Sequence, residues 1–82
     1  MDGPAARWVA RFAAELGIDP PSPDEVESLL ALAGTAAHAS ERTAAPLSTW
    51  LVGRAGLPPD EAHRLAVRVA TETAPCAPGS DR

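Results

Sequence analysis

His38 and Arg42 come closest in this chain to a pair of residues whose types and spacing could bind a ligand. They are four residues apart in a segment predicted to be helical, so their side chains are expected on one helical face. Two donors there, beside the free amides at the start of the next helix, could bind an anion such as phosphate or a carboxylate. A structural role is the alternative: His38 caps or packs at a helix end, and Arg42 pairs with Glu41 or with helix-terminal carbonyls.

Other residues of reactive type are not accompanied by the partner residues that a catalytic or metal site needs. The serines lie in no nucleophile motif such as Gly-x-Ser-x-Gly, and no glycine-rich phosphate loop occurs. The single cysteine, Cys76, makes no internal disulfide and no metal-ligand cluster, and the two histidines lack metal-site spacing. Carboxylate pairs such as Asp24 and Glu25 sit at predicted helix starts, where the helix dipole explains them. We therefore expect no catalysis, no bound metal and no cofactor.

Acyl carrier proteins are another class of small, acidic, four-helix domain. They carry a serine for phosphopantetheine at a helix start, usually within Asp-Ser-Leu. The nearest match here is Glu27-Ser28-Leu29, which lies inside a predicted helix after its first turn. Because the motif lacks its structural context, this assignment is disfavoured.

Size and charge exclude further classes. A chain of 82 residues allows one domain with a small core. The net charge of −4 argues against binding to a nucleic-acid backbone, which needs clustered positive charge. No apolar run approaches the roughly 20 residues of a membrane span, and no signal-peptide layout appears at the N-terminus. The sequence thus predicts a cytoplasmic protein that binds neither membranes nor nucleic acid.

The elements that would position these residues are all helices. Apolar residues recur at helical spacing from about Pro4 to Leu16, and Gly17 provides a helix stop. Ser22-Pro23-Asp24-Glu25 is a capping box that starts a second helix, which is expected to run to about Glu41.

A third helix is expected after Thr43, with Pro46 in its first turn and Gly56 at its end. A fourth follows Pro58-Pro59-Asp60-Glu61, where acidic residues occupy the first turn. No alternating pattern typical of strands occurs. The sequence therefore predicts an all-α, compact antiparallel bundle of about four helices over residues 1–73, followed by a disordered tail over 74–82.

Bulky apolar residues are few, and those of three helices are expected to meet in one core. Trp50 is expected to be buried as an anchor of this core; an exposed Trp50 would instead be a contact for a protein partner. The expected core comprises Trp8, Phe12, Leu29, Leu30, Ala33, Leu47, Trp50 and Leu51.

Several of these segments resemble a known family. The shared features are Leu29-Leu30-Ala31-Leu32-Ala33, a His-x-x-x-Arg-x-x-x-Pro-Leu core from His38 to Leu47, and Leu51-Val52-Gly53. The family is a small bacterial domain of unknown function that occurs alone or fused to molybdenum cofactor guanylyltransferases. The resemblance implies an accessory role beside cofactor biosynthesis.

The expected function is a non-catalytic module that binds a protein partner, such as a nucleotidyltransferase of that pathway, or itself. The alternative is a domain that binds a small anion or nucleotide through His38 and Arg42.

Overall fold

The chain folds into four α-helices and, over residues 3–72, which the computed structural model describes, it contains no strand. The helices are α1 (Pro4–Leu16), α2 (Pro23–Ala39), α3 (Ala44–Ala55) and α4 (Pro59–Glu72). The predicted all-α class with four helices is confirmed. The predicted tail at 74–82, with Cys76, lies outside the described residues. None of the described helices is long and apolar enough to cross a membrane.

Two glycines end helices as the sequence predicts. Gly17 closes α1 with φ 77°, and its N–H donates to the carbonyl oxygen of Ala14, while the Ile18 N–H reaches Ala13. Gly56 closes α3 with φ 75°, and its N–H donates to the carbonyl oxygens of Val52 and Gly53. A left-handed residue at this position is unstrained only without a side chain, so each glycine fixes where its helix stops.

The predicted capping box begins α2. The backbone N–H of Glu25 donates to Ser22 Oγ over 3.2 Å, and the Ser22 N–H donates to Glu25 Oε1 over 2.8 Å. Pro23 occupies the first turn, where its missing N–H has no helical partner to lose. The start of α2 is thus fixed by its own local sequence.

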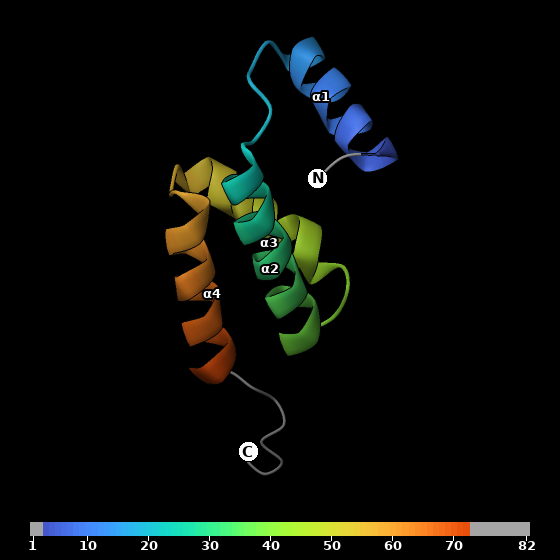
Figure 1. Cartoon of the computed structure of the whole chain (residues 1–82). Coiled ribbons are helices and arrows are strands. Elements are labelled where there is room, and N and C mark those ends of the chain that lie inside the picture. Colours follow the sequence, from blue (N-terminus) through green and yellow to red (C-terminus); the bar gives the residue numbers. More distant parts are fainter. Residues whose placement is uncertain (1–2, 73–82) are drawn as a thin grey trace.

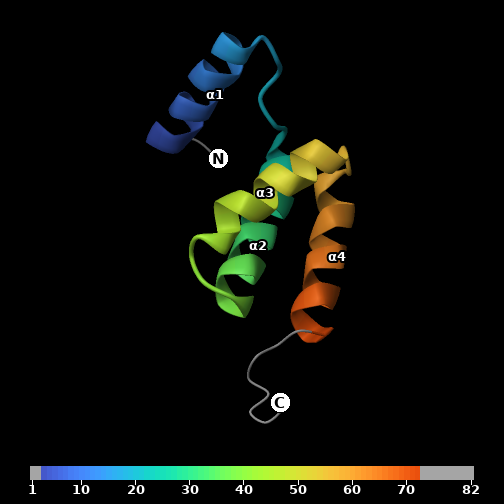
Figure 2. The ribbon, with the colours of Figure 1, turned by 180° about the vertical axis from the view of Figure 1, so that it is seen from behind.

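The tertiary packing is built around α2. The chain turns at residues 40–43, so α3 runs back along α2, and α4 then runs in the direction of α2 on its other side (Figures 1 and 2). This arrangement confirms the predicted return of the third helix against the second. We call α2, α3 and α4 together the three-helix unit. Its most enclosed side chains are Leu32 on α2, which is 1% exposed, and Ala62 on α4, which is 4% exposed.

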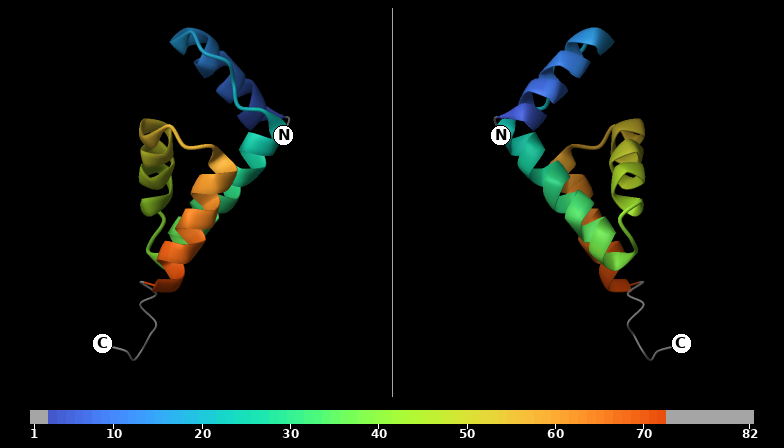
Figure 3. Two further views of the ribbon diagram at one scale, coloured as in Figure 1. Left: turned by 90° about the vertical axis from the view of Figure 1, so that its left-hand side faces the viewer. Right: turned by 90° about the vertical axis from the view of Figure 1, so that its right-hand side faces the viewer.

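The first helix stands apart from this unit. Residues 17–22 connect α1 to the start of α2. The α1 helix lies beyond that end of the three-helix unit (Figures 1 and 3). Neither α3 nor α4 packs along it. Its nearest neighbours form a shallow hollow of about 190 Å³, which Ala6, Val9 and Ala10 line together with Pro20, Pro21, Pro23 and Val26. One edge of α1 therefore faces its own linker.

The predicted core is wrong for most of its bulky members. Trp8 is 64% exposed, Trp50 is 62% exposed, and Phe12, Leu30, Leu47 and Leu51 are exposed as well. Helical periodicity does not determine which helical faces meet: the buried residue of α2 is Leu32, which lies outside the expected set of Leu29, Leu30 and Ala33. Closure of the core by α1 fails because that helix does not pack on the three-helix unit. Alanine and a single leucine occupy the enclosed positions instead.

Candidate functional site

His38 and Arg42 do not share a helical face, because α2 ends at Ala39 rather than near Glu41. The backbone leaves helical geometry at Ser40, with φ −133° and ψ −97°, and Arg42 lies in the turn that follows. The ring of His38 is tied to its own helix, since Nδ1 lies 2.9 Å from the carbonyl oxygen of Gly34. Arg42 is exposed and pairs with no carboxylate among residues 3–72, so the expected pair with Glu41 does not form.

The start of α3 offers few donors for an anion. The Ala44 N–H donates to the backbone carbonyl oxygen of Glu41 over 2.9 Å, and the Ala45 N–H donates to that of Arg42 over 3.1 Å. Pro46, the next residue, has no N–H. Thr43 stands at the N-cap position without a side-chain cap bond. The amides that would make a helix start attractive to an anion are therefore already used or missing.

The two tryptophans lie on different surfaces. Trp8 and Phe12 contact each other on α1, with ring centroids 4.9 Å apart, and both are exposed. Trp50 lies on the outer side of α3, where the Arg54 guanidinium sits 5.9 Å from the ring centroid. An arginine over an exposed indole is a modest stabilising contact. Each exposed aromatic is suited to contact with another protein.

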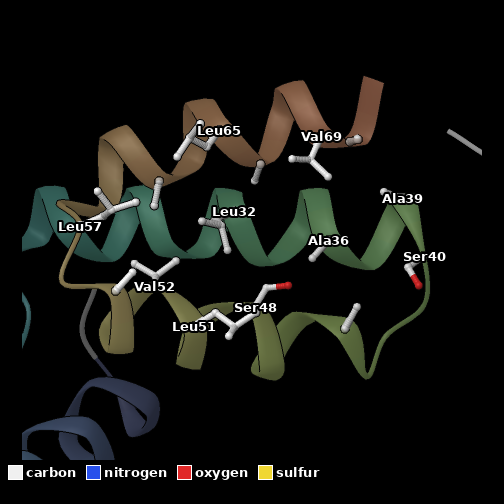
Figure 4. A pocket seen from close by; sticks show the side chains of 15 residues that line it. Leu32, Ala36, Ala39, Ser40, Ser48, Leu51, Val52, Leu57, Leu65 and Val69 are labelled. Atoms are coloured by element: carbon white, nitrogen blue, oxygen red, sulfur yellow. The ribbon is translucent and has the colours of Figure 1, made fainter. Parts of the chain in front are cut away.

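An open apolar groove lies within the three-helix unit. It has a volume of about 440 Å³, within the usual range for ligand or peptide sites, and α2 forms its floor between α3 and α4 (Figure 4). Its lining residues are Leu32, Ala36, Ala39, Ser40, Ala44, Ser48, Leu51, Val52, Ala55, Leu57, Ala62, Leu65, Ala66, Val69 and Ala70.

The chemistry of this groove is almost wholly apolar. Ser40 and Ser48 provide its only polar side chains, and no charged residue lines it. Alanines of α4 at helical spacing, Ala62, Ala66 and Ala70, lie along one wall. Small side chains on the walls leave width between the helices, so the groove remains open where larger residues would fill it. Such a surface is suited to contact with apolar side chains.

The sequence pattern accounts for part of this site. Ala62, Leu65, Ala66 and Val69 recur at helical spacing in α4, and these residues line the groove. The sequence places Leu51 of α3 in a closed core, yet Leu51 is 59% exposed. The missing signal is side-chain size: each of the three helices contributes alanines to the groove lining, so the helices pack without filling the space between them.

A second hollow lies where α2 and α4 begin. Acidic residues line it, namely Asp24, Glu25, Glu27 and Asp60, together with Ser28, Pro58 and Pro59. Glu25 is engaged in the capping box, and Asp60 lies 3.9 Å from Arg64. The described residues contain no group of three His, Cys, Asp or Glu side chains arranged to hold a metal ion. Positions in the first turns of α2 and α4 account for Asp24, Glu25 and Asp60 through the helix dipole.

The comparisons with known proteins give one match. No curated protein and no solved structure matches the chain. A family model described as a domain of unknown function, DUF6457, matches residues 2–80, which is nearly the whole chain. The chain therefore belongs to the DUF6457 family of domains of unknown function.

Proposed function

We propose that the chain is a non-catalytic interaction module whose apolar groove accepts an amphipathic helix from a protein. The observation that supports this is the open groove of about 440 Å³ with no charged lining residue. Apolar grooves between helices receive the apolar face of a partner helix through anchor residues at i, i+3/i+4 and i+7. The walls include alanines at Ala44, Ala55, Ala62, Ala66 and Ala70, so the helix that fits should carry bulky anchors.

The resemblance to domains fused with molybdenum cofactor guanylyltransferases gives this proposal a candidate partner class. A nucleotidyltransferase of that pathway would bind through an exposed helix that carries apolar anchors at the same spacing. The support for this partner is association alone, because a fused neighbour does not define a mechanism. The proposal of a helix-accepting groove does not depend on it.

The test uses a pair of matched arginine substitutions in α3. Leu51→Arg places a charge in the groove, whereas Leu47→Arg places it one turn away, outside the lining. Both leucines are exposed, at 59% and 65%, so neither change should unfold the domain. The probe is a labelled synthetic helical peptide with Trp, Phe and Leu at successive i, i+4 positions, and fluorescence anisotropy measures its binding.

The wild type and Leu47→Arg should bind the probe, and Leu51→Arg should bind it at least about tenfold more weakly, since a buried unpaired charge is costly. A peptide with the same composition but scrambled spacing is the control for non-specific adhesion. Equal binding of the two peptides, or equal loss in both arginine variants, would refute the groove as the site.

A further inference from the structure

The chain carries its own helix of the kind that the groove should accept. On α1, the side chains of Trp8, Phe12 and Leu16 follow one another at intervals of four residues, and all three are exposed. Trp8 and Phe12 are already in contact, so they present one joined aromatic surface. This stripe provides bulky side chains of the kind that an open groove with alanines in its walls can accept.

The dimensions of the two surfaces agree. The 13 residues of α1 compare with 12 in α3 and 14 in α4, the helices that form the groove walls. At about 1.5 Å per residue, these helices are of nearly equal length. The α1 helix of a second copy is therefore long enough to lie along the groove walls.

Charge also favours the contact. The α1 helix has two arginines, Arg7 and Arg11, against one glutamate, whereas residues 23–72 have four arginines against seven carboxylates. Arg11 pairs with Glu15 over 3.4 Å in α1, which leaves Arg7 as its excess positive charge. Opposite net charges support the approach of α1 to a three-helix unit.

The linker keeps α1 from its own groove. Pro20 and Pro21 stiffen residues 17–22. Ala6, Val9 and Ala10 line one hollow with these prolines, Pro23 and Val26. The groove floor begins at Leu32, more than two turns further along α2. A short, stiff connector between a helix and the rest of its domain favours exchange of that helix between two copies of the chain.

We infer that α1 of a second copy occupies the groove, so that two chains exchange their first helices in a two-fold symmetric dimer. This inference rests on the proposed helix-accepting groove and names its occupant. The four aromatic rings of the two α1–groove contacts would contribute roughly 600–1,000 Å² at about 150–250 Å² each when fully covered, and the groove surface beneath them adds to this, so the interface approaches the size of stable ones.

The first test compares matched tryptophan variants of the full chain by analytical ultracentrifugation. Trp8→Ala and Trp50→Ala remove the same side chain from sites of nearly equal exposure, 64% and 62%. Trp8→Ala should weaken the dimer by about 30-fold or more, as for an interface hot spot, and Trp50→Ala should leave it unchanged. A wild-type chain that stays monomeric at millimolar concentration overturns the inference, as does an equal effect of both variants.

Mixing two defective chains separates exchange between copies from closure within one chain. Trp8→Ala/Phe12→Ala has an intact groove and a disabled helix, and Leu51→Arg has an intact helix and a blocked groove. Neither should dimerise alone, yet the mixture should form a heterodimer through its one intact contact. Monomers in the mixture overturn the inference.

A labelled peptide of residues 3–18 then shows which proposal has failed. If it binds Trp8→Ala/Phe12→Ala but not Leu51→Arg, while the wild type is monomeric, the groove accepts a helix but not that of a second copy. That result keeps the proposed function and rejects the dimer. If the peptide and the synthetic probe both fail to bind, both proposals are rejected.

Discussion

The helices α1 and α4 are similar in sequence character but have different surroundings. Each is amphipathic, with an exposed ion pair four residues apart, Arg11–Glu15 in α1 and Asp60–Arg64 in α4. Yet α4 packs along α2, and α1 does not. The apolar face of α4 contains small residues such as Ala62, which allow close approach, and a short connection at 56–58 places the helix beside α2. Side-chain size and connector length, rather than amphipathicity, decide which helix joins the core.

The largest expected effect concerns the residue on which the three-helix unit closes. Leu32→Ala should lower the free energy of unfolding by about 2–5 kcal/mol, because Leu32 is 1% exposed and its loss leaves a cavity. Leu30→Ala, on the same helix but 61% exposed, should change it by less than about 0.5 kcal/mol. Urea denaturation followed by circular dichroism measures both. Equal effects would show that α2 has no distinct buried side.

A second pair of variants tests the contrast between α4 and α1 directly. Ala62→Leu should destabilise the domain by about 1–3 kcal/mol, because Ala62 is 4% exposed and the larger side chain would overpack its site. Ala5→Leu enlarges an exposed position of α1 and should leave the unfolding midpoint nearly unchanged. Thermal unfolding at low protein concentration measures the two. Destabilisation by Ala5→Leu of similar size would mean that α1 is packed in solution.

The start of α2, where the connector from α1 meets the three-helix unit, provides the next test. Ser22→Ala removes the cap acceptor for Glu25 and should cost about 1 kcal/mol of unfolding free energy. Thr43→Ala is the control at the N-cap position of α3, where the side chain makes no cap bond, and its cost should be near zero. The same urea series measures both variants. If Thr43→Ala proves the costlier change, the capping assignment of the two helices is wrong.

The smallest expected effect is at Arg42. Arg42→Ala should alter the unfolding free energy by less than about 0.5 kcal/mol, since the side chain is exposed and pairs with no carboxylate among the described residues. It should also leave the stabilising effect of added phosphate, measured by thermal shift, unchanged. A phosphate effect that is present in the wild type and lost in Arg42→Ala would restore the anion-binding alternative.

Local signals predicted the helices, and burial could not be predicted from them. Ser22 and Glu25, Gly17 and Gly56 act through bonds to near neighbours, so their roles can be read from the sequence. The exposure of Trp8 and Trp50 depends on how far apart helices stand after their connectors are built. The turn at Arg42 depends on where α2 unwinds before Pro46, a boundary that periodicity places only within a few residues.

The central position of α2 has a consequence for the speed of folding. Its two packing partners, α3 and α4, are the next helices along the chain, and short connectors at 40–43 and 56–58 join them. The α2–α3 contact joins helices that are adjacent in the chain, and the α2–α4 contact spans only one intervening helix, so both require closure of segments of modest length. A temperature jump should therefore reveal relaxation in the microsecond to millisecond range that is typical of helical domains with low contact order. Removal of α1 should leave that rate almost unchanged, because no step in closing the three-helix unit waits for it.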